Sequence, residues 1–200
     1  MSYCKFAPDH PVHGPYHALE YGFPIDDDAA LFERLVLEIN QAGLSWLTIL
    51  TKRENFRAAF DNFEIDKVAR YGSRERMRLL ADAGIIRNRL KVDAAITNAR
   101  RLLDLRQSHG SFAGWLDAHH PLDKPAWVKL FKQTFAFTGG EITGEFLLST
   151  GYLPDAHEES CPIYRKIVRL KPPWMRTARP SAPPASQSAP TKLRSATAKS

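Results

Sequence analysis

Apolar residues recur every three or four positions through most of this chain, which is the pattern of helices that bury one face. The longest such stretch runs from about residue 88 to 107, with its apolar stripe at Val92, Ile96, Leu102 and Leu103. Side chains that can cap a helix N-terminus occur at Asp26, Asp27 or Asp28, before a helix that runs to about Gln41, and then at Ser45, Asp66, Ser73, Ser111 and Thr143. No run of alternating β-branched residues bounded by hairpin turns is present. The pattern predicts an all-α fold without internal repeats.

The last part of the chain differs in composition from the rest. From Lys171 to the end there are six basic residues and no acidic ones, and Pro, Ala, Ser and Thr dominate. The whole chain has 28 Lys and Arg against 22 Asp and Glu, so residues 1–170 carry 22 of each and are neutral overall. We expect one domain over residues 1–171 and a disordered basic tail over 172–200. The tail is either a plain solvated terminus or a weak attractor of phosphate, and a nucleic-acid site in the domain must be a local patch.

Composition also narrows the cellular setting. Hydrophobic residues make up 44% of the chain, enough to bury a core. No apolar run approaches the roughly 20 residues that span a bilayer, and the first residues show no signal peptide. We therefore expect a cytoplasmic protein without a membrane partner, whose thiols stay reduced.

Each of the two cysteines has a histidine partner in the sequence. Cys4 and His17 are separated by twelve residues, and His157 and Cys161 by three. Two thiolates and two imidazoles form a complete tetrahedral zinc set, and joining the chain ends in this way would close a loop of nearly the whole domain. The alternatives are two buried structural cysteines, or a disulfide, which the cytoplasmic setting disfavours.

A carboxylate lies on the apolar face of the first long predicted helix. On a helical wheel Glu38 falls about 20° from Leu31, on the side that also carries Leu35. A carboxylate in that place is costly unless it is paired. It is therefore either a salt-bridged structural residue or a pocket-lining general base or cation binder. Tyr16 and Trp46 are aromatic candidates for the same pocket, and plain core packing is the alternative for each.

Residues 79–91 have the pattern of a helix, a tight turn and a second helix. Gly84 can take a left-handed conformation there, and free amides at the start of the second helix can hold a phosphate. Arg87, Arg89 and Lys91 follow and would add to that attraction. An ordinary helix–helix connection is the alternative.

Longer motifs surround these features. They are Tyr16-His17-Ala18-Leu19-Glu20-Tyr21-Gly22, Leu37-Glu38, Gln41-Ala42-Gly43-Leu44-Ser45-Trp46, Lys52-Arg53-Glu54-Asn55-Phe56, Asp82-Ala83-Gly84-Ile85-Ile86-Arg87, Phe135-Ala136-Phe137-Thr138-Gly139 and Gly151-Tyr152-Leu153. Together they resemble the DNA-3-methyladenine glycosylase I family over about residues 3–165.

The resemblance implies a helix–hairpin–helix glycosylase fold, in which two helical lobes surround a base pocket. Cys4, His17, His157 and Cys161 match the family's structural zinc ligands, so a zinc clasp would join the N- and C-terminal segments. Tyr16, Glu38 and Trp46 match its base-recognising residues, with Glu38 catalytic.

The implied activity is hydrolysis of the N-glycosidic bond of 3-methyladenine in double-stranded DNA, by a monomer. We expect Leu44 to enter the duplex, and Gly84, Arg87, Arg89 and Lys91 to contact DNA. Ile86 falls where bifunctional superfamily members carry a lyase lysine, so the enzyme should be monofunctional. Asp104 is the nearest match to an aspartate of other members, and a surface role is expected for it.

The chain also departs from the family's pattern. Phe6 and Tyr21 stand where tryptophans are usual, and Gln133-Thr134 and Gly140-Glu141 replace other pairs. These changes leave two alternative functions open: a non-catalytic DNA-binding module with an impaired pocket, and a zinc-stabilised helical interaction protein that uses its basic tail.

Overall fold

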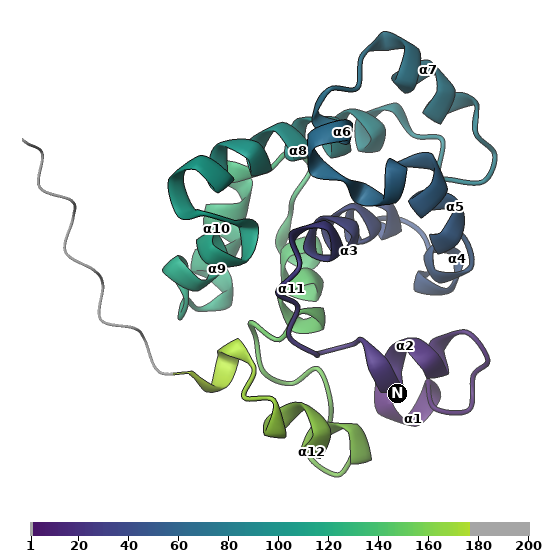
Figure 1. Ribbon diagram of the computed structural model, residues 1–200. Helices are drawn as coiled ribbons and strands as arrows, with labels where there is room; N and C mark the ends of the chain where they lie inside the picture. The colour runs from purple at the N-terminus through teal and green to yellow at the C-terminus, as the bar shows by residue number, and fades with distance from the viewer. Residues whose placement is uncertain (1, 177–200) are drawn as a thin grey trace, which may run out of the picture.

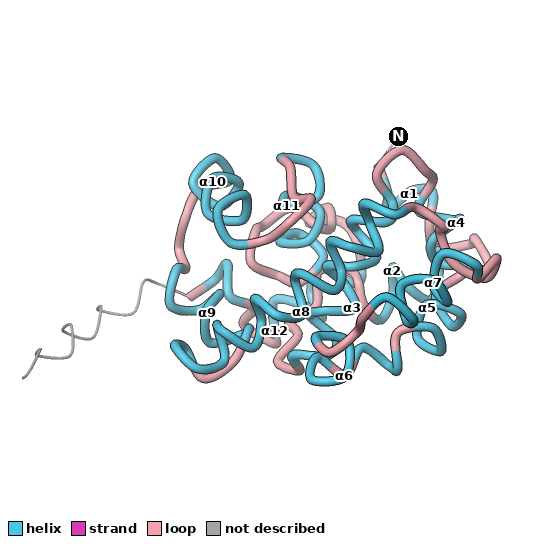
Figure 2. Tube along the Cα trace, turned by 90° about the horizontal axis from the view of Figure 1, so that it is seen from above, coloured by secondary structure: helices cyan, strands magenta, loops and turns pink. Residues whose placement is uncertain are grey.

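The computed structural model describes residues 2–176, which form helices joined by loops, without a strand (Figure 2). In chain order the elements are α1 (Tyr3–Phe6), α2 (His13–Leu19), α3 (Asp28–Gln41), α4 (Trp46–Thr51), α5 (Arg53–Ala59), η1 (Asp61–Phe63), α6 (Ile65–Ala69), α7 (Ser73–Ala81), α8 (Arg89–His109), α9 (Phe112–His119), α10 (Lys124–Thr134), α11 (Gly140–Ser149), α12 (Pro162–Arg169) and η2 (Pro173–Met175). The predicted all-α class is confirmed. None of these helices is both long and apolar enough to cross a membrane.

Helix α3 is the centre of the fold. Its residues 31–40 are all buried, because α4, α8, α9, α11 and η1 pack around it (Figure 1). On one side the core is filled by Phe32, Phe56, Phe60 and Phe63, and on the other by Phe112, Trp115, Phe131 and Phe146. Two groups of helices, α4–α7 and α9–α11, thus share α3 and the long helix α8.

A second, smaller apolar cluster joins the two ends of the described chain. Cys161, Ile163 and Ile167 of the α12 segment are buried there against Cys4, Ala18 and Phe23. Figure 1 shows the N-terminal helices α1 and α2 at the same end of the molecule as α12.

The described chain continues past the predicted domain boundary at residue 171. Pro173 is buried, the Trp174 ring stacks on Tyr164, and the Trp174 amide donates to the Gly151 carbonyl at 3.1 Å. Residues 172–176 therefore belong to the domain. The rest of the predicted tail, residues 177–200, lies outside the described residues.

Most of the predicted helix starts are confirmed, and three are wrong. Asp27, Ser45 and Ser111 accept hydrogen bonds from their helix N-termini, as does Asn88 before α8. The three wrong starts lie inside helices rather than before them.

Asp66 lies in the first turn of α6, Ser73 is the first residue of α7, and Thr143 lies one turn inside α11. At α7 the Glu75 carboxylate caps the Gly72 amide instead, at 2.8 Å. At α11 the chain becomes helical directly after the extended residue Gly139. Because a glycine cap has no side chain to detect, its position is invisible to a search for polar caps.

Candidate active site

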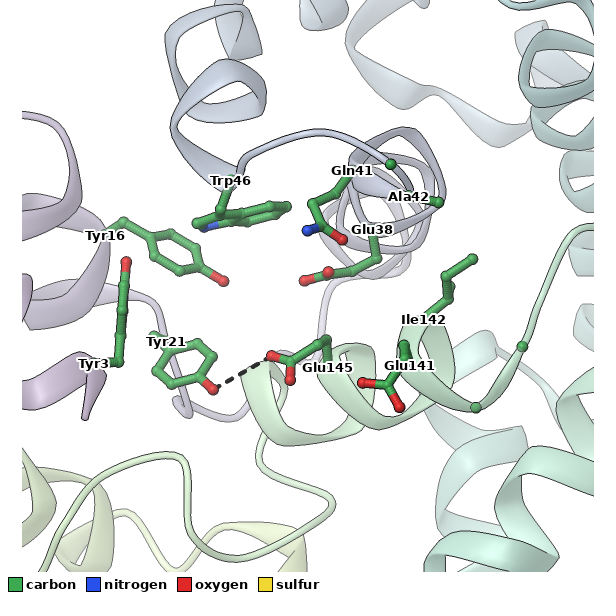
Figure 3. Close-up of a pocket in the computed structure, with 13 residues that line it drawn as sticks. Tyr3, Tyr16, Tyr21, Glu38, Gln41, Ala42, Trp46, Glu141, Ile142 and Glu145 are labelled. Atoms are coloured by element: carbon green, nitrogen blue, oxygen red, sulfur yellow. Dashed lines mark hydrogen bonds between the residues drawn. The ribbon is translucent and has the colours of Figure 1, made fainter. Parts of the chain in front are cut away.

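One cavity of about 760 Å³ opens between α3 and α11. It is lined by Tyr3, Tyr16, Tyr21, Glu38, Gln41, Ala42, Gly43, Trp46, Gly139, Gly140, Glu141, Ile142 and Glu145. The structure therefore brings together the three predicted pocket residues Tyr16, Glu38 and Trp46, from α2, α3 and the first turn of α4 (Figure 3).

The Glu38 carboxylate is the buried acid of this cavity. Glu38 is 4% exposed. Within residues 2–176, its carboxylate oxygens have no hydrogen-bond donor and no ion-pair partner. Burial raises the pKa of Glu38 to about 8; the nearby Arg34 opposes this shift and Glu145 adds to it. The salt-bridged structural alternative is therefore not what the structure shows. A carboxylate that lacks protein donors and faces a cavity is suited to a ligand that brings donors or positive charge.

Aromatic rings form the wall beside Glu38. The Tyr16 and Trp46 rings are 5.4 Å apart between centroids and inclined by 59°. The Trp46 indole Nε1 is buried without a hydrogen-bond partner among the described residues, so its N–H is available to an acceptor. Tyr3 and Tyr21 continue this wall beside Tyr16, and the Tyr21 hydroxyl reaches Glu145 of α11 (Figure 3). Such rings attract a cation placed over their faces.

A buried arginine fixes the direction of the Tyr16 hydroxyl. Arg34 is 2% exposed, and its Nη1 donates to the Tyr16 hydroxyl oxygen at 2.6 Å while its guanidinium lies 4.8 Å from the ring centroid. Arginine has no acceptor, so the hydroxyl accepts this bond and its own hydrogen remains free to be donated elsewhere. Glu20 balances the guanidinium charge at 3.3 Å.

Four further acidic or aromatic lining residues were not predicted as site residues. Tyr21 and Glu141 stand in the sequence analysis only as departures from the family's pattern, and Tyr3 and Glu145 have no predicted role. Glu141 and Glu145 are four residues apart on α11, so the spacing itself was a signal that they share a face. It was missed because the helix start was placed at Thr143, which separates the two residues.

The four predicted metal ligands form a cluster. The donor atoms of Cys4, His17, His157 and Cys161 all lie within 4.8 Å of one another, and both cysteines are free thiols, which excludes the disulfide. The Cys4 Sγ is 3.5 Å from His157 Nδ1, and the Cys161 Sγ is 3.7 Å from the same atom and 3.8 Å from His17 Nε2. Ligands of a tetrahedral zinc ion are separated by roughly 3.6 Å, given bond lengths of about 2.3 and 2.1 Å. The donor set thus fits a metal ion of this kind.

The turn between α7 and α8 differs from the expectation in the backbone conformation of Gly84. Gly84 is not among the residues with positive φ, so the predicted left-handed conformation is wrong. A Cβ at this position would lie 2.9 Å from Asp82 Oδ1 and 3.1 Å from the Asn55 Cβ, so glycine is needed for close approach. The ammonium of Lys52 donates to the Ala83 and Gly84 carbonyls at 2.9 and 3.2 Å and holds the turn from α4.

Of the three basic residues after this turn, two are exposed and one is not. Arg87 and Arg89 lie on the surface, with Arg89 80% exposed beside Asp93. Lys91 is only 5% exposed, and its ammonium donates to the Asn40 and Ala42 carbonyls at 2.8 and 2.7 Å. The expectation for Lys91 is therefore corrected: its charge serves the C-terminal end of α3, where helix carbonyls lack partners, rather than a phosphate.

Leu44 lies in the turn that Lys91 holds. Its side chain is 39% exposed, and the preceding Gly43 has a φ of 81°, which glycine adopts without strain. Gln41 Nε2 donates to the Leu44 carbonyl at 3.1 Å and closes the turn. Because Gln41 and Gly43 line the cavity, Leu44 is next to its mouth and is not a core residue.

Comparisons with known proteins agree with this geometry. A family model described as methyladenine glycosylase matches residues 6–134. DNA-3-methyladenine glycosylase 1 of Escherichia coli (strain K12) is 36% identical over 183 residues, which cover 82% of this chain and 97% of that protein. DNA-3-methyladenine glycosylase of Haemophilus influenzae is 31% identical over 178 residues, which cover 80% of this chain and 96% of that protein.

Solved structures are similar as well. The chain is similar to a variant of 3-methyladenine DNA glycosylase I crystallised in complex with 3-methyladenine, with a TM-score of 0.73, 34% identity, and coverage of 82% of this chain and 97% of that one. The structure of 3-methyladenine DNA glycosylase I from Staphylococcus aureus gives a TM-score of 0.73 and 34% identity, with coverage of 80% and 95%.

The burial of Glu38 predicts a specific dependence of stability on pH. In the folded protein Glu38 keeps its proton up to about pH 8, whereas its ordinary pKa is 4.5. Wild type therefore loses stability as pH rises through this window, and a Glu38→Gln variant, which does not titrate, avoids that loss. We expect the free energy of unfolding of Glu38→Gln, relative to wild type, to rise between about pH 5 and 9 by a few kcal/mol, at roughly 1.4 kcal/mol per pKa unit.

Urea unfolding at several pH values measures this difference. Glu54→Gln is the matched control, because Glu54 is exposed and pairs only with Arg57. Its stability relative to wild type should not change over the same range. A flat difference for Glu38→Gln would show that Glu38 is ionised in the folded protein at neutral pH.

Proposed function

This chain belongs to the methyladenine glycosylase family, and we infer that it is a DNA glycosylase that hydrolyses the bond between 3-methyladenine and deoxyribose. The observation that carries this inference is the Glu38 carboxylate, which is buried, unpaired and placed beside the Tyr16 and Trp46 rings in one cavity. Alkylated DNA is accordingly the proposed substrate, and a monomer remains the expected state.

The chemistry asked of the pocket is modest. Methylation of a ring nitrogen makes the base in DNA cationic and a good leaving group, so no strong general acid is needed. The enzyme has to accept the flipped nucleotide, hold the base and admit water. The aromatic wall favours a cationic base, and the Tyr16 hydroxyl hydrogen and the Trp46 N–H are free to be donated. The positive charge of the bound base lowers the pKa of Glu38, so that in the complex its ionised carboxylate accepts donors of the base edge and stabilises the positive charge that develops on the sugar as the bond breaks.

A monofunctional reaction fits the residues around the turn. Ile86, at the position where a lyase would carry an amine, is half-buried and packs against the core. Asp104 is 68% exposed on α8 beside Arg101, as expected for a surface residue. Ile86 offers no amine, and the Lys52 ammonium at this turn is engaged by the Ala83 and Gly84 carbonyls. We therefore propose that water is the attacking group and that the DNA strand stays unbroken.

The DNA-contacting surface follows from the same geometry. We propose that Leu44 fills the gap left by the flipped nucleotide, while Gly84, Arg87 and Arg89 contact the phosphate backbone. The buried Lys91 stabilises the Leu44 turn of this surface by donating hydrogen bonds to the Asn40 and Ala42 carbonyls.

We also propose that the Cys4, His17, His157 and Cys161 cluster holds a structural zinc ion. Four protein donors complete the tetrahedral set and leave no position for a reacting water. The His157 Nε2 lies 2.7 Å from the Tyr21 carbonyl, so the ring donates there and keeps Nδ1 free for a metal. The bound ion would supply cohesion between the chain ends, and the chain's own residues would perform the reaction.

The first test is base release. We expect purified protein to release 3-methyladenine from alkylated duplex DNA, to leave an abasic site in an intact strand, and to give no adduct with borohydride. Glu38→Gln should slow release by roughly 10²-fold, the scale of losing one well-placed electrostatic group, whereas Glu54→Gln should match wild type. A trapped adduct, or full activity in Glu38→Gln, would overturn the assignment.

The second test concerns Leu44. We expect Leu44→Ala to weaken binding of a duplex that carries an abasic-site analogue by about tenfold, because the gap in the base stack is no longer filled. The melting temperature should stay close to wild type, since Leu44 is 39% exposed. Leu170→Ala, which shortens another exposed leucine, is the control. A melting loss on the ~2–5 kcal/mol scale of a core leucine would contradict the placement.

The third test is metal content. We expect about one equivalent of zinc per chain by elemental analysis. Cys161→Ser should lose the metal and melt at a lower temperature, because metal binding contributes to folding, while Ser160→Ala should keep both. Protein without metal that melts like the purified wild type would remove zinc from the proposal.

A further inference from the structure

Glu38 does not face its cavity alone. Glu145, on α11, points into the same space from the opposite wall, and its Oε2 accepts a hydrogen bond from the Tyr21 hydroxyl at 3.5 Å (Figure 3). Glu141, one helical turn earlier, lies at the exposed rim. Among residues 2–176, the cavity lining thus contains three carboxylates and no lysine or arginine.

Several carboxylates that share one cavity repel one another when they are ionised, unless a positive charge lies among them. Burial raises the pKa values of both Glu38 and Glu145. The charge of a neighbouring carboxylate raises them further: Glu145 acts on Glu38, and Glu141 acts on Glu145. The positive groups nearby are outside the lining: Arg34 behind Tyr16, and Lys124 on α10. The other titratable groups that face the space, Tyr3, Tyr16 and Tyr21, have raised pKa values and stay neutral at physiological pH.

Protons are one source of that positive charge, and a ligand is another. A neutral base supplies no positive charge, so when it displaces water the carboxylates must either keep their protons or repel one another. A base that carries a permanent positive charge removes the repulsion and is attracted more strongly as water leaves. The buried and unpartnered state of Glu38 shows that nothing within the described protein already fills this role.

We propose that Glu145 is a specificity-determining residue of the pocket: with Glu38 it forms a pair of anionic walls that admit a base only when the base is cationic. The proposal rests on the proposed glycosylase function and extends it to the class of lesion. Purines alkylated at a ring nitrogen, which are cationic as nucleotides, fit the pocket. Unmodified or deaminated purines, which are neutral, do not.

The role can be measured without DNA. The probes are the fixed cation 3,9-dimethyladeninium and its neutral counterpart 9-methyladenine, titrated by quenching of tryptophan fluorescence at about pH 9, where the carboxylates ionise. We expect wild type to prefer the cation. Glu145→Gln should bind the cation about tenfold more weakly and 9-methyladenine with unchanged affinity, which also shows that the pocket is intact. Glu145→Asp, which keeps the charge, should retain the preference, and Glu54→Gln should match wild type.

Kinetics on alkylated duplex DNA complete the test. Glu145→Gln should raise KM by about tenfold and change kcat by no more than about threefold, because Glu38 still serves the bond-breaking step. The inference is overturned if Glu145→Gln keeps the wild-type ratio of cation to neutral affinity, or if kcat falls and KM does not change. Absence of any base release by wild type would instead defeat the proposed function, while the ratio of probe affinities would still report on Glu145.

Discussion

A single carboxylate on the buried part of α3, without a partner among the described residues, is the constraint that the rest of the site depends on. Other charged side chains buried on α3 are matched: Glu33 pairs with Arg53 and Arg57, and Arg34 with Glu20 and the Tyr16 hydroxyl. Glu38 is left without a partner at a cost to folding, since burial disfavours its charged form. Such a cost is expected where a site is organised for a ligand rather than for stability. The cavity, its aromatic wall and the direction of the Tyr16 hydroxyl are all arranged around that missing partner.

The cluster of Cys4, His17, His157 and Cys161, which joins the two ends of the described chain, positions this aromatic wall. Two members of the cluster directly follow a ring of the pocket in the sequence: Cys4 follows Tyr3, and His17 follows Tyr16. The third ring, Tyr21, is held through its own carbonyl, which accepts from His157 Nε2 at 2.7 Å. A donor set that brings α1, α2 and the segment before α12 together therefore fixes three pocket residues at once, although it lies outside the cavity. Short helices such as α1, with four residues, have little stability of their own and need such a tertiary anchor.

The sequence was sufficient to predict site residues whose chemical type is unusual for their position. It was not sufficient for residues whose role depends on tertiary packing. Glu38 was detectable because a carboxylate interrupts an apolar stripe, and the ligand set because two cysteines each had a histidine. Glu145 was missed because the α11 start is a glycine, which gives no capping signal. Lys91 was assigned to phosphate because charge alone does not show that helix carbonyls lie above it. The proposed role of Leu44 came from its place in the sequence, because the turn between the Glu38 helix and the Trp46 helix was expected at the mouth of the pocket.

The contacts of two lysines explain how a neutral domain can combine an acidic pocket with the proposed DNA-contacting surface. Lys52, at the end of α4, donates to carbonyls of the turn before α8, and Lys91, on α8, donates to carbonyls at the end of α3. These four hydrogen bonds link the segments on either side of the Leu44 turn to the Gly84 turn and to α8, so the two turns are held together. Both ammonium groups are thereby used inside the protein, and Arg87 and Arg89 are left to face solvent. The exposed arginines are thus available to the phosphates of the proposed complex, and the carboxylates of the cavity to its base, so the two opposite charges of the substrate are met by different parts of a neutral domain.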